Sequence, residues 1–119
     1  MADGAAGLES GAVALGGPEV LDNTDLADGR ALVLMYPDYG GMGAFGLEAV
    51  RRYTGDTLVL VGEWADSTLG AYAEGVPESG QSFSAECQTL VRERFELQET
   101  VALPSWPLYR DVLRIWRRR

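Results

Sequence analysis

The stretch ALVLMYPDYGGMGAFGLEAVRRYTGDTLVLVG, residues 31–62, decides the fold class. It begins and ends with short runs of bulky apolar residues, at 31–36 and 57–62. Neither run alternates with polar residues, which is typical of parallel strands that are covered on both faces. Between them, apolar residues spaced three and four apart over 43–53 predict a helix. A strand, a helix and a strand within about 30 residues predict a βαβ unit with parallel strands.

The remaining sequence predicts one more helix and two final strands. Residues 82–95 carry an apolar stripe at helical spacing. Residues 97–103 alternate like a strand with the odd-numbered side chains on one face, and 111–117 follow after a short proline-containing connection. Strands joined so closely pair antiparallel. We therefore expect an α/β fold: a partial Rossmann-like sheet of parallel strands with crossover helices, ending in an antiparallel hairpin.

Length and charge limit the kind of protein. The chain of 119 residues is long enough for one small domain. Its net charge of −8, from eighteen acidic and ten basic residues, disfavours general attachment to nucleic acid or to an anionic membrane. The local exception is a basic C-terminus that includes Arg114 and residues 117–119. It is a solvated strand end or, alternatively, a phosphate or RNA contact.

Residue usage excludes several kinds of chemistry. The chain has no histidine and one cysteine, Cys87, which rules out Ser–His and Cys–His catalysis and an internal disulfide. The same scarcity leaves no zinc or iron–sulfur ligand set, so we expect no metal. Cys87 lies on the apolar stripe of the 82–95 helix, which indicates a buried small hydrophobe. No apolar run approaches the roughly 20 residues that span a bilayer, and no secretory signal is present, so the predicted location is the cytoplasm.

The sequence divides into two parts. Residues 1–29 are rich in glycine, alanine and aspartate, which predicts a flexible N-terminal segment. Residues 30–119 contain every predicted strand and helix of the sheet, so we expect one folded unit there. Within it, residues 63–81 have little apolar content and follow the second strand directly. A loop of that length in a compact domain is often functional.

Several short motifs resemble a group of uncharacterised proteins similar to class I S-adenosylmethionine-dependent methyltransferases. The motifs are Tyr36-Pro37, Glu48-Ala49-Val50-Arg51, Tyr53, Gly55-Asp56, Gly62-Glu63 and the runs 101–107 and 113–118. The resemblance covers residues 31–119. The class I fold has a seven-stranded sheet that ends in an antiparallel hairpin, and the predicted order of elements matches its second half. The resemblance therefore implies the C-terminal half of a methyltransferase-like domain.

The front half of that fold is not in this sequence. No strand followed by a Gly-x-Gly-x-Gly loop, with an acidic residue about 20 positions on, occurs near the N-terminus. The resemblance implies S-adenosylmethionine as the cofactor, but the elements that would hold its methionine and ribose parts are missing. We expect a truncated or partial methyltransferase-like protein, natural or a gene-model fragment, that is inactive alone; any activity would be that of a transferase. The alternatives are a non-catalytic interaction module and a small phosphate-binding protein. The sequence has no glycine motif that would support the second alternative.

Two turns after the predicted strands carry the candidate site residues. The resemblance implies that Pro37, Asp38 and Tyr39 form a substrate-positioning turn, although Asp38 stands where the group has a second proline. An ordinary strand-ending turn is the competing interpretation. Glu63 and Asp66 follow the second strand at the edge where open α/β sheets bind ligands, so we expect them to face a ligand crevice. The competing interpretation is a pair of solvated loop acids.

The first strand also predicts a partner. In the resembled fold, its outer side would pair with a strand of the missing half. An unpaired apolar edge is an aggregation liability. We therefore expect either a partner chain or homodimerisation through the exposed sheet edge at residues 31–36.

Overall fold

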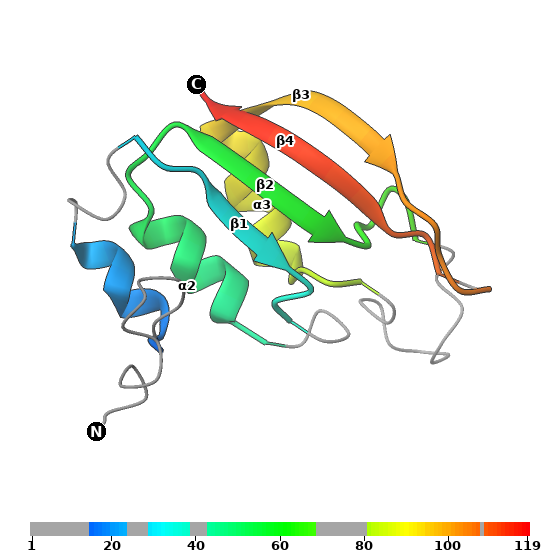
Figure 1. Ribbon diagram of the computed structural model, residues 1–119, viewed down its shortest axis with the longest axis horizontal. Coiled ribbons are helices and arrows are strands. Elements are labelled where there is room, and N and C mark those ends of the chain that lie inside the picture. The colour runs from blue at the N-terminus through cyan, green and yellow to red at the C-terminus, as the bar shows by residue number, and fades with distance from the viewer. Residues whose placement is uncertain (1–14, 24–28, 39–42, 69–80, 108) are drawn as a thin grey trace, which may run out of the picture.

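The computed structural model describes residues 15–23, 29–38, 43–68, 81–107 and 109–119. Its elements in chain order are η2 (Pro18–Asp22), β1 (Leu32–Met35), α2 (Phe45–Arg52), β2 (Thr57–Gly62), α3 (Ala85–Arg94), β3 (Phe95–Ala102) and β4 (Val112–Arg118). The strands form one four-stranded mixed sheet in the order β1-β2-β4-β3 (Figure 1). The predicted α/β class and the order of elements are thus confirmed.

β1 and β2 are parallel neighbours, as the two apolar runs predict, and Leu32 faces Leu58 across the pair. Helix α2 lies between them in the chain. The residue that ends α2, Tyr53, holds the starting ends of both strands together. Its hydroxyl lies 2.6 Å from the carbonyl oxygen of Arg30 and 2.9 Å from that of Thr57. The helix end therefore sets the relative position of the two parallel strands.

β3 and β4 form the predicted antiparallel hairpin, and β4 lies between β2 and β3. The expectation that the odd-numbered side chains of residues 97–103 share one face is wrong. A register shift between Leu97 and Glu99 sets Leu97 opposite Trp116 but Glu99 opposite Ile115. Since neighbouring residues of β4 point to opposite faces, the extra residue in β3 reverses its alternation.

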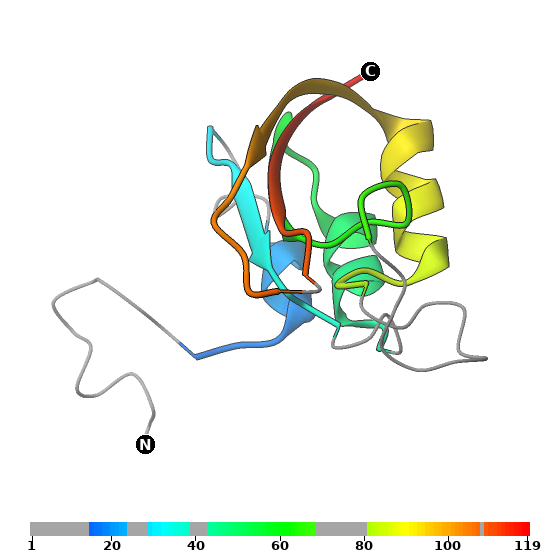
Figure 2. The same cartoon turned by 90° about the vertical axis from the view of Figure 1, so that its right-hand side faces the viewer.

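Both helices lie on the same face of the sheet (Figures 1 and 2). Their apolar side chains pack against the buried sheet residues Leu34, Leu58, Leu60 and Trp116. From α2 the core receives Leu47, Ala49 and Val50, and from α3 it receives Cys87 and Val91. The burial of Cys87 is as predicted. The described part of the molecule is therefore a two-layer α/β structure.

The coverage of both strand faces, predicted from the unbroken apolar runs, is wrong for β1, although Val61 of β2, which lies beside Met35, is only 5% exposed. Val33 and Met35 of β1 alternate with the buried Leu34, so they point away from the helices, and they are 53% and 61% exposed. An unbroken apolar run shows that both faces of a strand suit an apolar environment. It does not show which polypeptide provides the second layer.

Two segments outside the strands complete the core. Trp64, two residues after the end of β2, is fully buried, with its ring centroid 4.9 Å from that of Phe83 and 5.3 Å from that of Trp116. The apparent polarity of the predicted loop 63–81 concealed this anchor; residues 69–80 lie outside the described residues. Ser84 begins α3 by accepting a hydrogen bond from the backbone N–H of Cys87 at 3.1 Å.

Part of the N-terminal segment packs onto the domain. Within residues 15–23, η2 lies against α2, and Leu21 packs against the core. Asp22 forms an ion pair with Arg52 at 2.7 Å. Residues 1–14 and 24–28 of the predicted flexible segment lie outside the described residues. Among the described helices, none is long and apolar enough to cross a membrane.

Candidate functional site

The carboxyl ends of β1 and β2 are joined through Ser82, which lies shortly before α3. The backbone N–H of Asp38 donates to the Ser82 carbonyl oxygen at 3.1 Å, and the Ser82 N–H donates to the Glu63 carbonyl oxygen at 2.8 Å. The Ser82 hydroxyl accepts the Glu63 backbone N–H at 3.0 Å. Two of the predicted site segments therefore meet at the sheet edge where open α/β sheets bind ligands.

Asp38 is a buried helix cap. Its two carboxylate oxygens accept the backbone N–H groups of Phe45 at 2.9 Å and Gly46 at 3.0 Å, at the start of α2. The side chain is only 3% exposed. A carboxylate at a helix N-terminus satisfies otherwise unpaired N–H groups and interacts favourably with the helix dipole. Both oxygens are thus engaged in holding α2 against the turn after β1.

The rest of the predicted turn packs closely. A Cβ atom on Gly46 would lie 3.2 Å from Cγ of Pro37, so the turn touches the first residues of α2. Tyr36, which precedes it, has a φ of 50°, in the left-handed region that favours glycine. Tyr39 lies outside the described residues. The described part of the turn therefore combines a strained backbone with contacts to the helix.

Glu63 is buried, at 1% exposure, rather than a solvated loop acid. One carboxylate oxygen accepts the Thr68 hydroxyl at 2.7 Å, and the other accepts the backbone N–H of Arg110. Thr68 belongs to the segment after β2, and Arg110 belongs to the connection between β3 and β4. Glu63 therefore fastens two connections to the end of the sheet.

Tyr36 and Asp111 form a second polar group at the same edge. Their side chains lie close enough for each to influence the pKa of the other. Partial burial raises the pKa of Tyr36, and the charge of Asp111 adds to that rise. Burial also raises the pKa of the Asp111 carboxyl, the neighbouring Tyr36 side chain opposes the rise, and the charge of Glu63 adds to it. The carboxyl ends of β1 and β2 thus bring Glu63, Asp111 and the phenol of Tyr36 close enough for each charge to affect the pKa of its neighbour.

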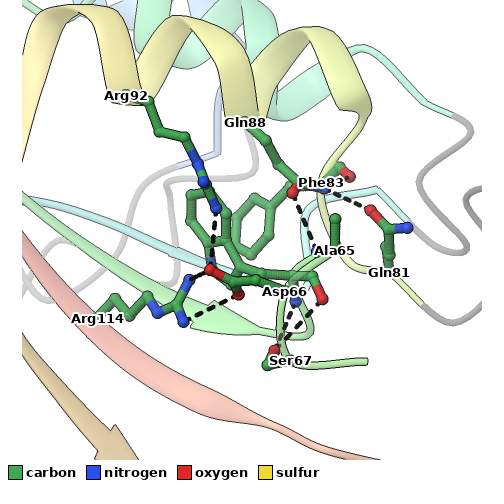
Figure 3. Close-up of polar contacts among 9 residues, drawn as sticks. Ala65, Asp66, Ser67, Gln81, Phe83, Gln88, Arg92 and Arg114 are labelled. Carbon is green, nitrogen blue, oxygen red and sulfur yellow. Dashed lines mark hydrogen bonds and ion pairs between the residues drawn. The ribbon is translucent and has the colours of Figure 1, made fainter. Parts of the chain in front are cut away.

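Asp66 faces a different neighbourhood, between α3 and β4 (Figure 3). It forms ion pairs with Arg114 at 3.0 Å and with Arg92 at 3.1 Å. Burial opposes its ionisation, but Arg114 and Arg92 outweigh that effect and hold the pKa of Asp66 below its usual value. Both guanidinium groups also lie over the ring of Trp64, at 5.7 Å for Arg92 and 5.4 Å for Arg114. Asp66 thus joins the helix layer to the sheet.

A groove of about 540 Å³ lies beside this ion pair, with Asp66, Gln88 and Arg92 in its lining. Gln88 of α3 is 5% exposed and makes three hydrogen bonds. Its amide nitrogen donates to Gln81 at 2.6 Å and to the Phe83 carbonyl oxygen at 2.9 Å, while its amide oxygen accepts the Ala65 N–H at 3.1 Å. Figure 3 shows these contacts bringing the segment after β2 onto the helix.

The described candidate acids are occupied by contacts within the chain. Asp38 and Glu63 hold backbone amides of the chain itself, and Asp66 holds two arginines. These residues therefore do not fit a complete S-adenosylmethionine site, and no transfer step follows from them. Within the described ranges, no group of three or more acidic or cysteine side chains is placed to hold a metal ion.

Comparison with protein-family models, with curated proteins and with solved structures finds no match to this chain. The geometry of the chain itself is therefore the basis for assigning a role.

Several contributors to this edge have no clear signal in the sequence. Ser82 stands out only as one of two serines that could cap α3. Asp111 stands out only as the first residue of the predicted last strand, far along the chain from Tyr36 and Glu63. Gln88, which lies in the separate groove beside Asp66, occupies its helix without any motif. Their common role depends on contacts between segments that are distant in sequence, which periodicity does not report.

Proposed function

We propose that this chain is a methyltransferase-like half-domain that acts as part of an assembly and does not transfer a methyl group alone. The observation that supports it is the mixed sheet, in which two parallel strands continue into an antiparallel hairpin. The resembled fold ends in such a hairpin. The motifs at residues 36–37, 55–56 and 62–63 lie at the connections of this sheet.

The site supports dependence on another polypeptide. The three acids predicted to serve a ligand are engaged in holding the fold, so the described residues leave few free polar groups for a ligand at this end of the sheet. Two polar groups remain near the ends of β1 and β2: Tyr36 is exposed and Asp111 is half-buried. A crevice with one wall binds a ligand weakly, because most of the ligand surface stays in water.

A titration monitored by amide chemical shifts tests this proposal. S-adenosylmethionine at millimolar concentration is expected to cause small, unsaturated shifts confined to the ends of β1 and β2 and to the start of β4. Methionine alone serves as the control ligand and should cause none there. Saturation at micromolar cofactor would contradict dependence on another chain. No shift at any concentration would contradict the methyltransferase-like part of the proposal.

A second candidate function is a non-catalytic interaction module that retains the half-fold. The uncovered apolar side chains of β1 favour it, since large exposed apolar patches mark interaction sites. The same titration separates the two candidates, because a pure interaction module has no reason to respond to the cofactor at the ends of β1 and β2.

A further inference from the structure

The two edges of the sheet differ in how they are protected. The outer strand β3 carries exposed Glu96 and Glu99 and a register shift, which are devices that keep an edge from pairing with another chain. The other outer strand, β1, has the sequence Leu-Val-Leu-Met and has neither a charge nor a shift in its pairing with β2. In the described part of the chain, β1 is bonded on its β2 side only.

The uncovered face of the sheet is apolar from β1 inward. Two rows of facing residues cross it, and the register gives them as Val33–Val59–Ile115 and Met35–Val61–Leu113. None of these six residues is charged. Exposure is largest at β1, where Val33 and Met35 are 53% and 61% exposed, whereas Val61 is 5% exposed. The apolar surface is therefore most open beside the unprotected edge.

Charge is distributed unevenly along the strands. Where β1 and β2 begin, the described part of the sheet end carries four arginines, Arg30, Arg117, Arg118 and Arg119, against two acids, Asp56 and Glu96. Where β1 and β2 end, the described residues place Asp38, Glu63 and Asp111 against one arginine, Arg110. A strand that pairs antiparallel with β1 from a second copy sets the positive end of each copy beside the negative end of the other. Opposite charges so placed favour that orientation.

We propose that this chain forms a homodimer in which the β1 strands of two copies pair antiparallel about a two-fold axis at Leu34. The pairing joins the two four-stranded sheets into one continuous sheet. It sets Val33 beside the partner's Met35 on the uncovered face and Leu34 beside the partner's Leu34 on the helix side. One surface serves both copies, as a two-fold interface requires.

The backbone provides a specific way to test the pairing. The Tyr36 N–H donates to Val61 of β2, so alternation along the strand points the N–H groups of Val33 and Met35 away from β2. Val33→Pro removes one of these outward groups, and proline is compatible with an edge strand. Met35→Lys instead places a charge on the edge. Val101→Lys is the matched control, because Val101 is 38% exposed on the same face but on the protected strand β3.

Sedimentation velocity of the full chain over a wide concentration range is expected to show a reversible monomer–dimer equilibrium. Val33→Pro and Met35→Lys should each raise the dimer Kd by about tenfold or more, a loss of about 1.4 kcal/mol, and Val101→Lys should leave it unchanged. Added salt should weaken the dimer, because it screens the charges at the sheet ends. Far-UV circular dichroism checks that each variant folds; if Val33→Pro does not, Met35→Lys decides.

A monomer at every concentration would overturn the dimer, and so would a dimer that survives both β1 variants or is lost with Val101→Lys. The inference rests on the part of the proposed function that requires an assembly, but the two can fail separately. A monomer with weak cofactor-induced shifts removes the dimer and keeps the methyltransferase-like half-domain. A dimer without any cofactor-induced shift supports the dimer and removes the methyltransferase-like half-domain.

Discussion

Asp38 caps a helix from outside the helix. The residue directly before α2, Ala44, has no side chain that accepts a hydrogen bond, and the carboxylate of Asp38 takes that role from the end of β1. The contact couples strand and helix through a single side chain. It also explains why glycine occupies positions 43 and 46, since a Cβ atom at either would lie within 3.0 Å of an Asp38 oxygen.

Replacing Asp38 should cost stability. Asp38→Ala leaves the N–H groups of Phe45 and Gly46 without their acceptors, so the expected loss is about 1–3 kcal/mol. Asp38→Asn keeps one oxygen acceptor and should lose less. Urea denaturation measures both. Glu86→Ala, an exposed acid in the first turn of α3, is the control and should stay within about 0.5 kcal/mol of the unmodified chain. Equal losses for the Asp38 and Glu86 variants would contradict the capping role.

The ion pairs of Asp66 predict a dependence of stability on pH. The arginines hold the folded-state pKa of Asp66 below its usual value of 3.8, so its stabilising effect is present above that value and is lost as the pH falls through the folded-state pKa. Asp66→Asn should therefore lower the midpoint of urea denaturation at neutral pH. The decrease should be small, since Asp66 is half exposed. The difference should disappear once the pH lies below the folded-state pKa. An equal difference at both pH values would contradict the ionic contribution.

The junction of β2 with the segment before α3 depends on a glycine. Gly62 has a φ of 145°, and a Cβ atom there would lie 2.4 Å from Cβ of Ser82. Ser82 joins the ends of β1 and β2, so close approach at this point is part of how the sheet edge is held. No other residue type has both the backbone freedom and the lack of volume that the junction requires.

Gly62→Ala should destabilise the protein by more than about 1 kcal/mol, because it adds backbone strain and displaces Ser82. Gly29→Ala is the matched control: Gly29 also has a positive φ, of 69°, but a Cβ atom there would meet nothing within 4 Å. Gly29→Ala therefore reports strain alone. Thermal unfolding compares the two. A loss at Gly62 no larger than that at Gly29 would show that close packing against Ser82 is unimportant.

The helices and strands differ in how well local pattern predicts them. The apolar runs predict β1 and β2 as parallel strands, and the apolar stripes predict α2 and α3, because periodicity records which side chains face the core. The register shift in β3 was not predicted. The strand prediction treated residues 97–103 as continuous alternation, although Gln98, Glu99 and Thr100 are all polar, and only pairing with β4 reveals the additional residue.

The single cysteine reports on the folded molecule as a whole. Cys87 lies between the helices and the sheet with no exposed surface, and burial, with the nearby charge of Asp38, raises the pKa of its thiol to about 12. A thiol that is both buried and protonated reacts slowly with thiol reagents. Access to it requires the two layers to separate.

Labelling of Cys87 by a disulfide reagent should therefore proceed only through unfolding. We expect the rate to rise steeply with added urea, in parallel with the unfolded fraction. A chain with Cys87→Ala and Thr89→Cys, which moves the thiol to an exposed position on α3, is the control and should react quickly without denaturant. Fast labelling of native Cys87 would show that the helix layer opens locally.

The amino-acid sequence by itself determined the α/β class, the order of strands and helices, the parallel pair and the closing hairpin. These follow from local periodicity and turn chemistry, which each segment carries within itself. Only the tertiary structure decided that both helices lie on one face, that β1 pairs on one side only among the described residues, and that the candidate acids bind backbone amides and arginines. Those outcomes depend on which distant segments meet, and a pairing such as Asp38 with α2 or Asp66 with Arg114 forms only when the core brings its partners together.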